Sequence, residues 1–242
     1  MTTFYYFQTE FEERTIQQYA DYIFDFFLSI KCIEKESFDR IYYINSKPRN
    51  WINIENNKEN RMVLAQQLLS HLKKELKTYE NILNPTVNTM IKNVCVTTFE
   101  TRIAGVLTYI MFNFSKASPC NITFDVRNVN WDFNFYKSIF EIIINKINPK
   151  YAYLIPHNLM RAMNYVDLPS NTYKVGWVNY FSNKLNLNSK LQFMNQEFFH
   201  EGFLTMSIKE VFDENNPRHN DCARTMFDFF KDNNIVKESD YF

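Results

Sequence analysis

The sequence predicts an α+β protein in which a mostly antiparallel central sheet is flanked by helices. Apolar residues recur at helical spacing in several segments, of which the clearest are residues 15–31, 61–77 and 134–147. Strand-like runs follow one another at residues 93–101, 105–115 and 121–128. The connections between these runs are too short to hold a crossover helix, which favours an antiparallel meander.

Composition supports one globular domain spanning residues 1–242. Hydrophobic residues make up 45% of the chain and aromatic residues 17%, which excludes disorder as a description of the whole chain. Lys plus Arg and Asp plus Glu both number 27, so the net charge is zero. This balance gives no electrostatic reason to expect nucleic acid or an anionic membrane as a partner.

The N-terminus lacks the basic and long apolar regions of a secretion signal, and no run of about eighteen uncharged apolar residues exists in the chain. We therefore expect a cytoplasmic protein with no membrane partner. The four cysteines are Cys32, Cys95, Cys120 and Cys222, and their spacing matches neither a zinc site nor a redox pair. Buried free thiols are the expected state.

The first half of the chain alternates strands and helices. A short strand is possible at residues 4–8, and Thr15 with Gln18 forms a capping box that begins a helix ending near Lys31. A strand follows at residues 38–44. Residues 45–60 are polar and predict a solvated connection that carries one large aromatic residue, Trp51, before the helix of residues 61–77.

In the meander, the run at residues 105–115 alternates two sets of side chains, and neither set is strongly polar. We therefore expect a helix layer on at least one face. Asn148 and Pro149 end the helix of residues 134–147. A strand at residues 151–155 and a short helix at residues 157–165 are expected next.

The chain ends with a strand, a second strand and a helix around one apolar seam. Residues 175–182 (VGWVNYFS) are rich in β-branched and aromatic residues and predict a central strand, and residues 202–207 alternate like another strand. Asn216 can cap the last helix, and Pro217 suits its first position.

Motifs for catalysis or cofactor binding are absent. The three glycines lie far apart, so no phosphate-binding loop exists, and no serine or cysteine lies in a nucleophile motif. We expect no catalytic residue, no cofactor and no metal site. The alternative is a metal-dependent or hydrolytic enzyme built on four residues: His200, Glu201, Asp213 and His219. Their spacing is not diagnostic, and Asp213 is better explained as a turn residue.

Two exposed segments are candidates for binding a partner. Arg49, Asn50 and Trp51 could stack on a nucleic acid, but zero net charge and the nearby Glu55 disfavour this. Trp and Arg supply much of the binding energy at protein interfaces, which makes a protein-binding loop the stronger reading. A Trp51 that folds back on its own domain remains the alternative. Trp131 has the same two alternatives: its side chain either binds a partner or packs against its own domain.

The C-terminal third resembles the immunity protein 52 family, most clearly over residues 175–231. The resemblance rests on VGWVNYFS at residues 175–182, the short strand of residues 202–207, and FDENNPRH at residues 212–219. The chain has Asn179 where threonine is commoner in the family.

This resemblance implies a non-catalytic immunity protein that binds and neutralises a cognate bacterial toxin. The toxins of this family resemble nucleases of the restriction-endonuclease fold, often delivered by type VI secretion. The motif residues read as scaffold, because Trp177 and its neighbours would fill the sheet while His219 would shape the helix start. We therefore expect partner contacts from exposed loops, at Arg49, Asn50, Trp51, Glu55 and Trp131.

Overall fold

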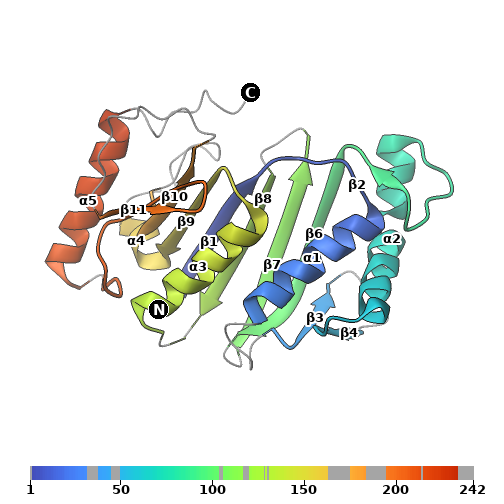
Figure 1. The fold of residues 1–242 in the computed structure, drawn as a ribbon, viewed down its shortest axis with the longest axis horizontal. Helices are drawn as coiled ribbons and strands as arrows, with labels where there is room; N and C mark the ends of the chain where they lie inside the picture. Colours follow the sequence, from blue (N-terminus) through green and yellow to red (C-terminus); the bar gives the residue numbers. More distant parts are fainter. Residues whose placement is uncertain are drawn as a thin grey trace. The chain divides into compact units, whose positions relative to one another are not determined.

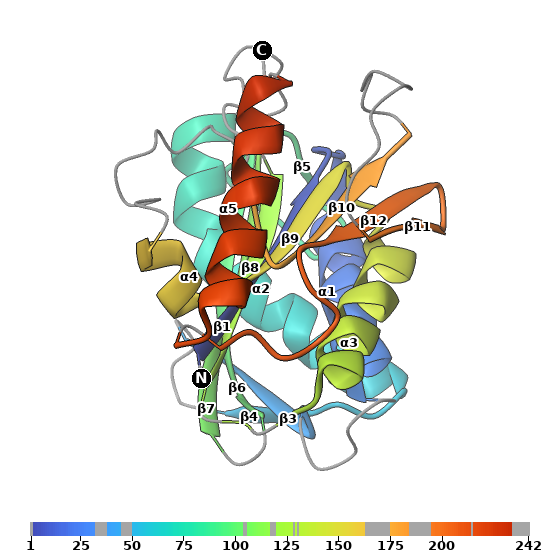
Figure 2. The ribbon, with the colours of Figure 1, turned by 90° about the vertical axis from the view of Figure 1, so that its left-hand side faces the viewer.

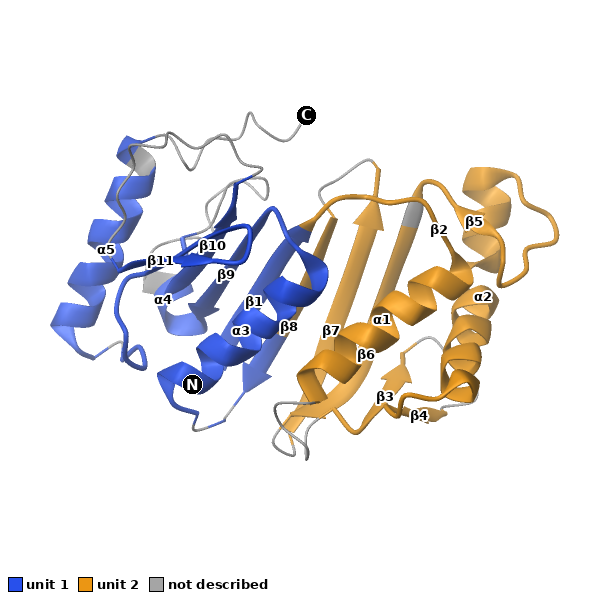
Figure 3. Cartoon of the chain, viewed as in Figure 1, with its two compact units in different colours: residues 1–8, 125–242 blue, residues 9–124 orange. Residues whose placement is uncertain are grey.

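The computed structural model describes residues 2–31, 38–44, 50–103, 106–116, 120–127, 129, 131–162, 175–183, 195–213 and 215–233. The chain divides into two compact units (Figure 3): unit 1 contains Met1–Gln8 and Asp125–Phe242, and unit 2 contains Thr9–Phe124. Each unit holds an antiparallel sheet with helices, so the predicted fold class is confirmed. The assignment of residues 1–242 to a single domain stays a prediction.

Unit 2 holds a five-stranded antiparallel sheet in the order β8-β7-β6-β3-β4. Its helices are α1 (Ile16–Lys31) and α2 (Lys58–Glu80). Its strands in chain order are β2 (Arg14–Thr15), β3 (Arg40–Tyr43), β4 (Trp51–Asn53), β5 (Met90–Ile91), β6 (Val94–Ile103), β7 (Val106–Ser115) and β8 (Cys120–Arg127, of which the part up to Phe124 belongs to this unit). The small strands β2 and β5 pair separately.

The meander predicted over residues 93–128 is confirmed as β6, β7 and β8. The capping box that begins α1 is also confirmed, because the Thr15 N–H donates to Gln18 Oε1 at 2.8 Å and the Gln18 N–H donates to Thr15 Oγ1 at 3.1 Å. α2 begins earlier than predicted, since Asn57 caps it by accepting from the Asn60 N–H at 2.7 Å.

Both helices of unit 2 lie on one face of its sheet. The rings of Phe26 and Phe27 on α1 lie 5.2 Å and 6.0 Å from the ring of Phe112 on β7. His71 on α2 lies 5.4 Å from the ring of Tyr43 on β3. Figure 1 shows α1 in front of β7 and β6. The expected helix layer is therefore confirmed on one face.

The prediction of a solvated connection over residues 45–60 is wrong for residues 51–53. These residues form β4, which pairs with β3 in the register Tyr42 with Trp51 and Ile41 with Ile52. Ile52 points toward the helices and is buried, while Trp51 lies on the opposite face of the sheet. Residues 45–49 lie outside the described residues.

Unit 1 holds five antiparallel strands of the sheet, in the order β11-β12-β10-β9-β1. Its elements are β1 (Thr2–Thr9, up to Gln8 in this unit), α3 (Phe133–Ile147), β9 (Tyr151–Pro156), α4 (His157–Ala162), β10 (Val178–Ser182), β11 (Gln196–Phe199), β12 (Gly202–Met206) and α5 (Pro217–Asp232). The predicted central strand is confirmed, since β10 lies between β9 and β12.

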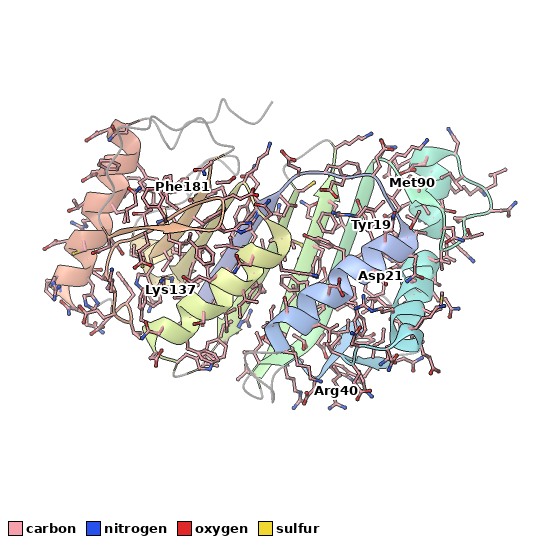
Figure 4. All side chains as sticks on the ribbon, viewed as in Figure 1. Tyr19, Asp21, Arg40, Met90, Lys137 and Phe181 are labelled. Atoms are coloured by element: carbon pink, nitrogen blue, oxygen red, sulfur yellow. The ribbon has the colours of Figure 1, made fainter. Side chains whose placement is uncertain are left out.

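Helices cover both faces of the unit 1 sheet (Figure 2). Phe140 on α3 lies 6.5 Å from Tyr5 on β1. On the other face, Phe230 on α5 lies 5.3 Å from Phe181 on β10, a residue that is labelled in Figure 4. The buried Trp177 donates its Nε1–H to the Ile208 carbonyl oxygen at 3.2 Å, so it serves as scaffold, as predicted. With both faces occupied by helices, unit 1 offers less open sheet surface than unit 2.

Candidate functional site

The face of the unit 2 sheet opposite α1 and α2 is the strongest candidate site. Successive side chains of a strand point to opposite faces, so Ile110 and Phe112 on β7 point to the helices while Tyr109 and Met111 point away. Strand pairing extends this face across the sheet. We call it the open face, and define it as Arg40, Tyr42, Trp51, Asn53, Val96, Thr98, Glu100, Arg102, Leu107, Tyr109, Met111, Asn113, Asn121 and Thr123.

Apolar side chains on the open face remain exposed to solvent. The exposed fractions are 38% for Val96, 38% for Leu107, 43% for Tyr109 and 37% for Met111. These residues come from the two adjacent strands β6 and β7 and lie close together on the sheet. Single exposed apolar residues are ordinary on protein surfaces, but a contiguous group marks a binding surface more often than chance.

The β3–β4 end of the open face carries an aromatic and cationic cluster. The guanidinium of Arg40, labelled in Figure 4, lies 5.0 Å from the centre of the Trp51 ring, and the Tyr42 ring lies 5.7 Å from the same ring. Trp51 keeps part of its surface exposed. A partly exposed indole held in place by a stacked guanidinium is a preorganised contact for a partner.

The structure places the five predicted partner-binding residues in different surroundings. Trp51 lies on the open face, and Asn50 and Glu55 are exposed on either side of β4. Arg49 lies outside the described residues. Trp131 belongs to unit 1, where its ring packs 4.7 Å from that of Phe135 and remains partly exposed. The binding role of all five stays a prediction.

Sequence reasoning about binding did not single out the β6 and β7 residues of the open face. The signal was present in the alternation of β7, where Leu107, Tyr109 and Met111 form a second apolar set beside the core set. Such a run indicates a strand covered on both faces or a strand with one apolar face exposed. The choice between them depends on where the helices pack, which the strand's own sequence does not encode.

The histidine region has structural roles in the described part of the chain. His219 Nδ1 accepts a hydrogen bond from the Asp213 N–H at 2.9 Å, and Asp213 Oδ1 accepts one from the Asn215 N–H at 2.9 Å. Asn216 Oδ1 accepts from the Arg218 N–H at 3.1 Å. The predicted turn and cap roles are confirmed. Among the described residues, no three His, Cys, Asp or Glu side chains are grouped to hold a metal ion.

Two of the thiols that the structure describes, those of Cys95 and Cys120, are buried and poorly nucleophilic. Burial raises the pKa of the Cys95 thiol far above its ordinary value, and burial is also the main cause of the raised pKa of Cys120. Cys222 is half-buried. Buried free thiols are therefore confirmed for Cys95 and Cys120, while Cys32 lies outside the described residues. A high thiol pKa leaves little thiolate, which is the nucleophilic form.

A cavity of about 420 Å³ lies in unit 1 where α5 begins. It is lined by Asn195, Ser207, Ile208, Lys209, Glu210, Arg218 and Cys222. Its charges are already paired, since Arg218 lies 3.5 Å from Glu210 and Lys209 lies 3.1 Å from Glu197. These pairs leave this cavity weaker than the open face as a candidate site.

Comparisons with known proteins add little to this picture. No family model matches the chain, and no curated protein matches it. The structure is similar to that of the Pseudomonas aeruginosa T6SS protein PA0821, with a TM-score of 0.43 and 11% sequence identity over 85% of this chain and 67% of that one. None of the described helices is long and apolar enough to cross a membrane. A likeness at this level leaves the function to be argued from the residues themselves.

Proposed function

We propose that this protein is a cytoplasmic immunity protein that binds and neutralises a cognate bacterial toxin without catalysis or cofactor. The toxin would be a nuclease effector of restriction-endonuclease fold, delivered by type VI secretion. The class of partner comes from the resemblance of residues 175–182, 202–207 and 212–219 to the immunity protein 52 family. The surface that we propose to bind the toxin is the open face of unit 2.

The observation that carries this proposal is an exposed apolar sheet face built from the adjacent strands β6 and β7. Small-molecule sites are concave and enclose most of their ligand, whereas protein interfaces are broad and combine aromatic, Met and Arg side chains. Tyr109, Met111, Trp51 and Arg40 provide this composition on adjacent strands. A protein partner therefore fits this surface better than a small substrate does.

Inhibition by occupancy requires affinity rather than chemistry. A nanomolar dissociation constant corresponds to about 12 kcal/mol. Tyr109 is 43% exposed, and covering that fraction of a side chain of roughly 200 Å² at about 25 cal/mol per Å² gives roughly 2 kcal/mol. A few such residues could supply the central contacts, and the bound protein would then cover the toxin's active site or block its assembly.

The rival function, a hydrolytic or metal-dependent enzyme, gains no support from the described residues. His219 uses Nδ1 to hold the turn before α5, and His200 lies in the turn between β11 and β12 with a φ of 50°. Neither arrangement brings a base to a nucleophile or a ligand to a metal.

A survival assay tests the proposal. The product of the gene immediately upstream is expressed in a bacterial host, alone and together with this protein, and the dissociation constant of the purified pair is measured. We expect this protein to restore growth, and Trp51→Ala or Tyr109→Ala to weaken binding by about 2 kcal/mol. Tyr79→Ala is the matched control, because Tyr79 is an exposed aromatic residue on α2 away from the open face. An unrelated metabolic protein upstream, with no gain in survival, would contradict the proposal.

A further inference from the structure

Two arginines lie near each other on adjacent strands of the open face. Tyr42 on β3 pairs with Glu100 on β6, and Thr101 Oγ1 on β6 donates to the Arg40 carbonyl oxygen at 3.0 Å. Arg40 lies two residues before Tyr42, and Arg102 lies two residues after Glu100. Both therefore lie on the open face, at the same end of the two strands, and both are exposed. Like charges that lie close together on neighbouring strands repel each other.

The described part of the chain does not neutralise this pair. Neither guanidinium lies within ion-pair distance of a described carboxylate, and the one acidic residue on the open face, Glu100, is only 6% exposed. The guanidinium of Arg40 lies over the Trp51 ring, 5.0 Å from its centre. A contact with a ring face uses none of the N–H donors of the guanidinium, which can then bind acceptors on a partner. An acidic group on a partner would pair with these donors and relieve the repulsion.

The cationic pair borders the apolar part of the open face. Arg102 on β6 pairs with Leu107 on β7, and Tyr109 and Met111 follow Leu107 on the same side of the strand. A partner that covers both parts must present carboxylates next to an apolar patch. The open face therefore has a polarity, with a cationic end at β3 and an apolar stripe along β7.

We propose that the open face binds a protein surface on which Asp or Glu side chains flank an apolar patch, with the carboxylates placed against Arg40 and Arg102. This inference rests on the proposed function and specifies the chemistry of the toxin's contact surface. A second copy of this chain fits poorly, because two copies of the open face would bring cationic groups together. Nucleic acid also fits poorly, because a phosphate backbone needs more than two exposed cations and the chain has no net charge.

The experiment uses the catalytically inactivated product of the upstream gene as the probe. Arg102→Glu places a carboxylate beside Arg40, so it should fold with an unfolding midpoint equal to or above that of the wild type. The same variant should raise the dissociation constant for the probe by about 30-fold or more. The new glutamate would repel the carboxylate of the probe that Arg102 attracts. Arg224→Glu, which reverses an exposed arginine on α5, is the matched control and should change the dissociation constant by less than about 3-fold. Replacing the facing carboxylate of the probe with Lys should restore binding to Arg102→Glu.

The other outcomes overturn either this inference alone or the proposed function together with it. Binding of Arg102→Glu with wild-type affinity would overturn this inference and leave the proposed function intact. Dimerisation detected by light scattering and abolished by Arg102→Glu or Tyr109→Ala would also overturn it, as would tighter binding to a single-stranded DNA oligonucleotide than to the probe. Failure of the wild-type protein to bind the probe at all would overturn the proposed function, and this inference with it.

Discussion

Adjacent residues of β7 should differ sharply in how much they contribute to folding stability. Phe112 is fully buried, and its ring lies 5.2 Å from that of Phe26, 5.8 Å from that of Phe99 and 6.1 Å from that of Phe114. Removing this ring leaves a cavity among rings that cannot all move to fill it. Phe112→Ala should therefore lower the free energy of unfolding by about 3 to 5 kcal/mol.

The neighbouring Met111 provides the contrast, because it lies on the open face and is partly exposed. Met111→Thr should cost less than about 1 kcal/mol, since threonine suits a strand and little packing is lost. Urea unfolding followed by tryptophan fluorescence measures both midpoints, and equal m values validate the comparison. If Phe112→Ala does not fold, Phe112→Leu should still cost about 1 to 2 kcal/mol.

Equal losses from the changes at Met111 and Phe112 would refute the reasoning. They would mean that the open face is packed against something in the isolated protein, because an exposed side chain has few contacts to lose. The proposed binding surface would then be occupied, and the case for a partner at this position would fall.

Three further predictions concern other parts of the chain. Gly176→Ala should lower the free energy of unfolding by about 1 to 3 kcal/mol, because the added Cβ would lie 2.6 Å from a carbonyl oxygen of β9; an unchanged melting temperature would contradict this. The hydrogen bond from Lys137 lowers the pKa of Glu197 below its ordinary value of 4.5, and Lys137→Met should raise that pKa in an NMR titration. Since the folded-state pKa is lowered, the stability that this carboxylate contributes is complete above its unfolded-state pKa and is lost as the pH falls through the folded-state value. Iodoacetamide near pH 8 should alkylate Cys222 before Cys95, because burial raises the pKa of Cys95, and mass spectrometry measures the order.

Elements with local signals were predictable from sequence. The capping box of Thr15 and Gln18 gave the start of α1, and Asn216 with Pro217 gave the start of α5. α3 ends at Ile147, as the pair Asn148 and Pro149 predicted, and the structure adds that Asn148 has the left-handed conformation. These signals concern backbone groups within a few residues of one another, so the surrounding fold is not needed to interpret them.

Elements that depend on distant partners were not predictable. β4 is three residues long and exists because β3 supplies its hydrogen bonds, and β11 is a four-residue strand that pairs with β12. The turn that joins β11 to β12 contains His200 rather than an Asn-Gly pair, so the hairpin has a weak sequence signal. The open face depends in the same way on both α1 and α2 packing on the other side of the sheet.

Because the two faces of β7 have different roles, substitutions in this strand should have different effects from insertions or deletions. Substitutions at its odd-numbered positions, such as Leu107 and Tyr109, can retune recognition while the hydrophobic layer beneath stays intact. A single-codon insertion or deletion within the strand reverses the direction of every following side chain and exchanges the two layers. If the proposed partner changes its contact surface over time, we expect this strand to accumulate replacements and almost no changes in its length.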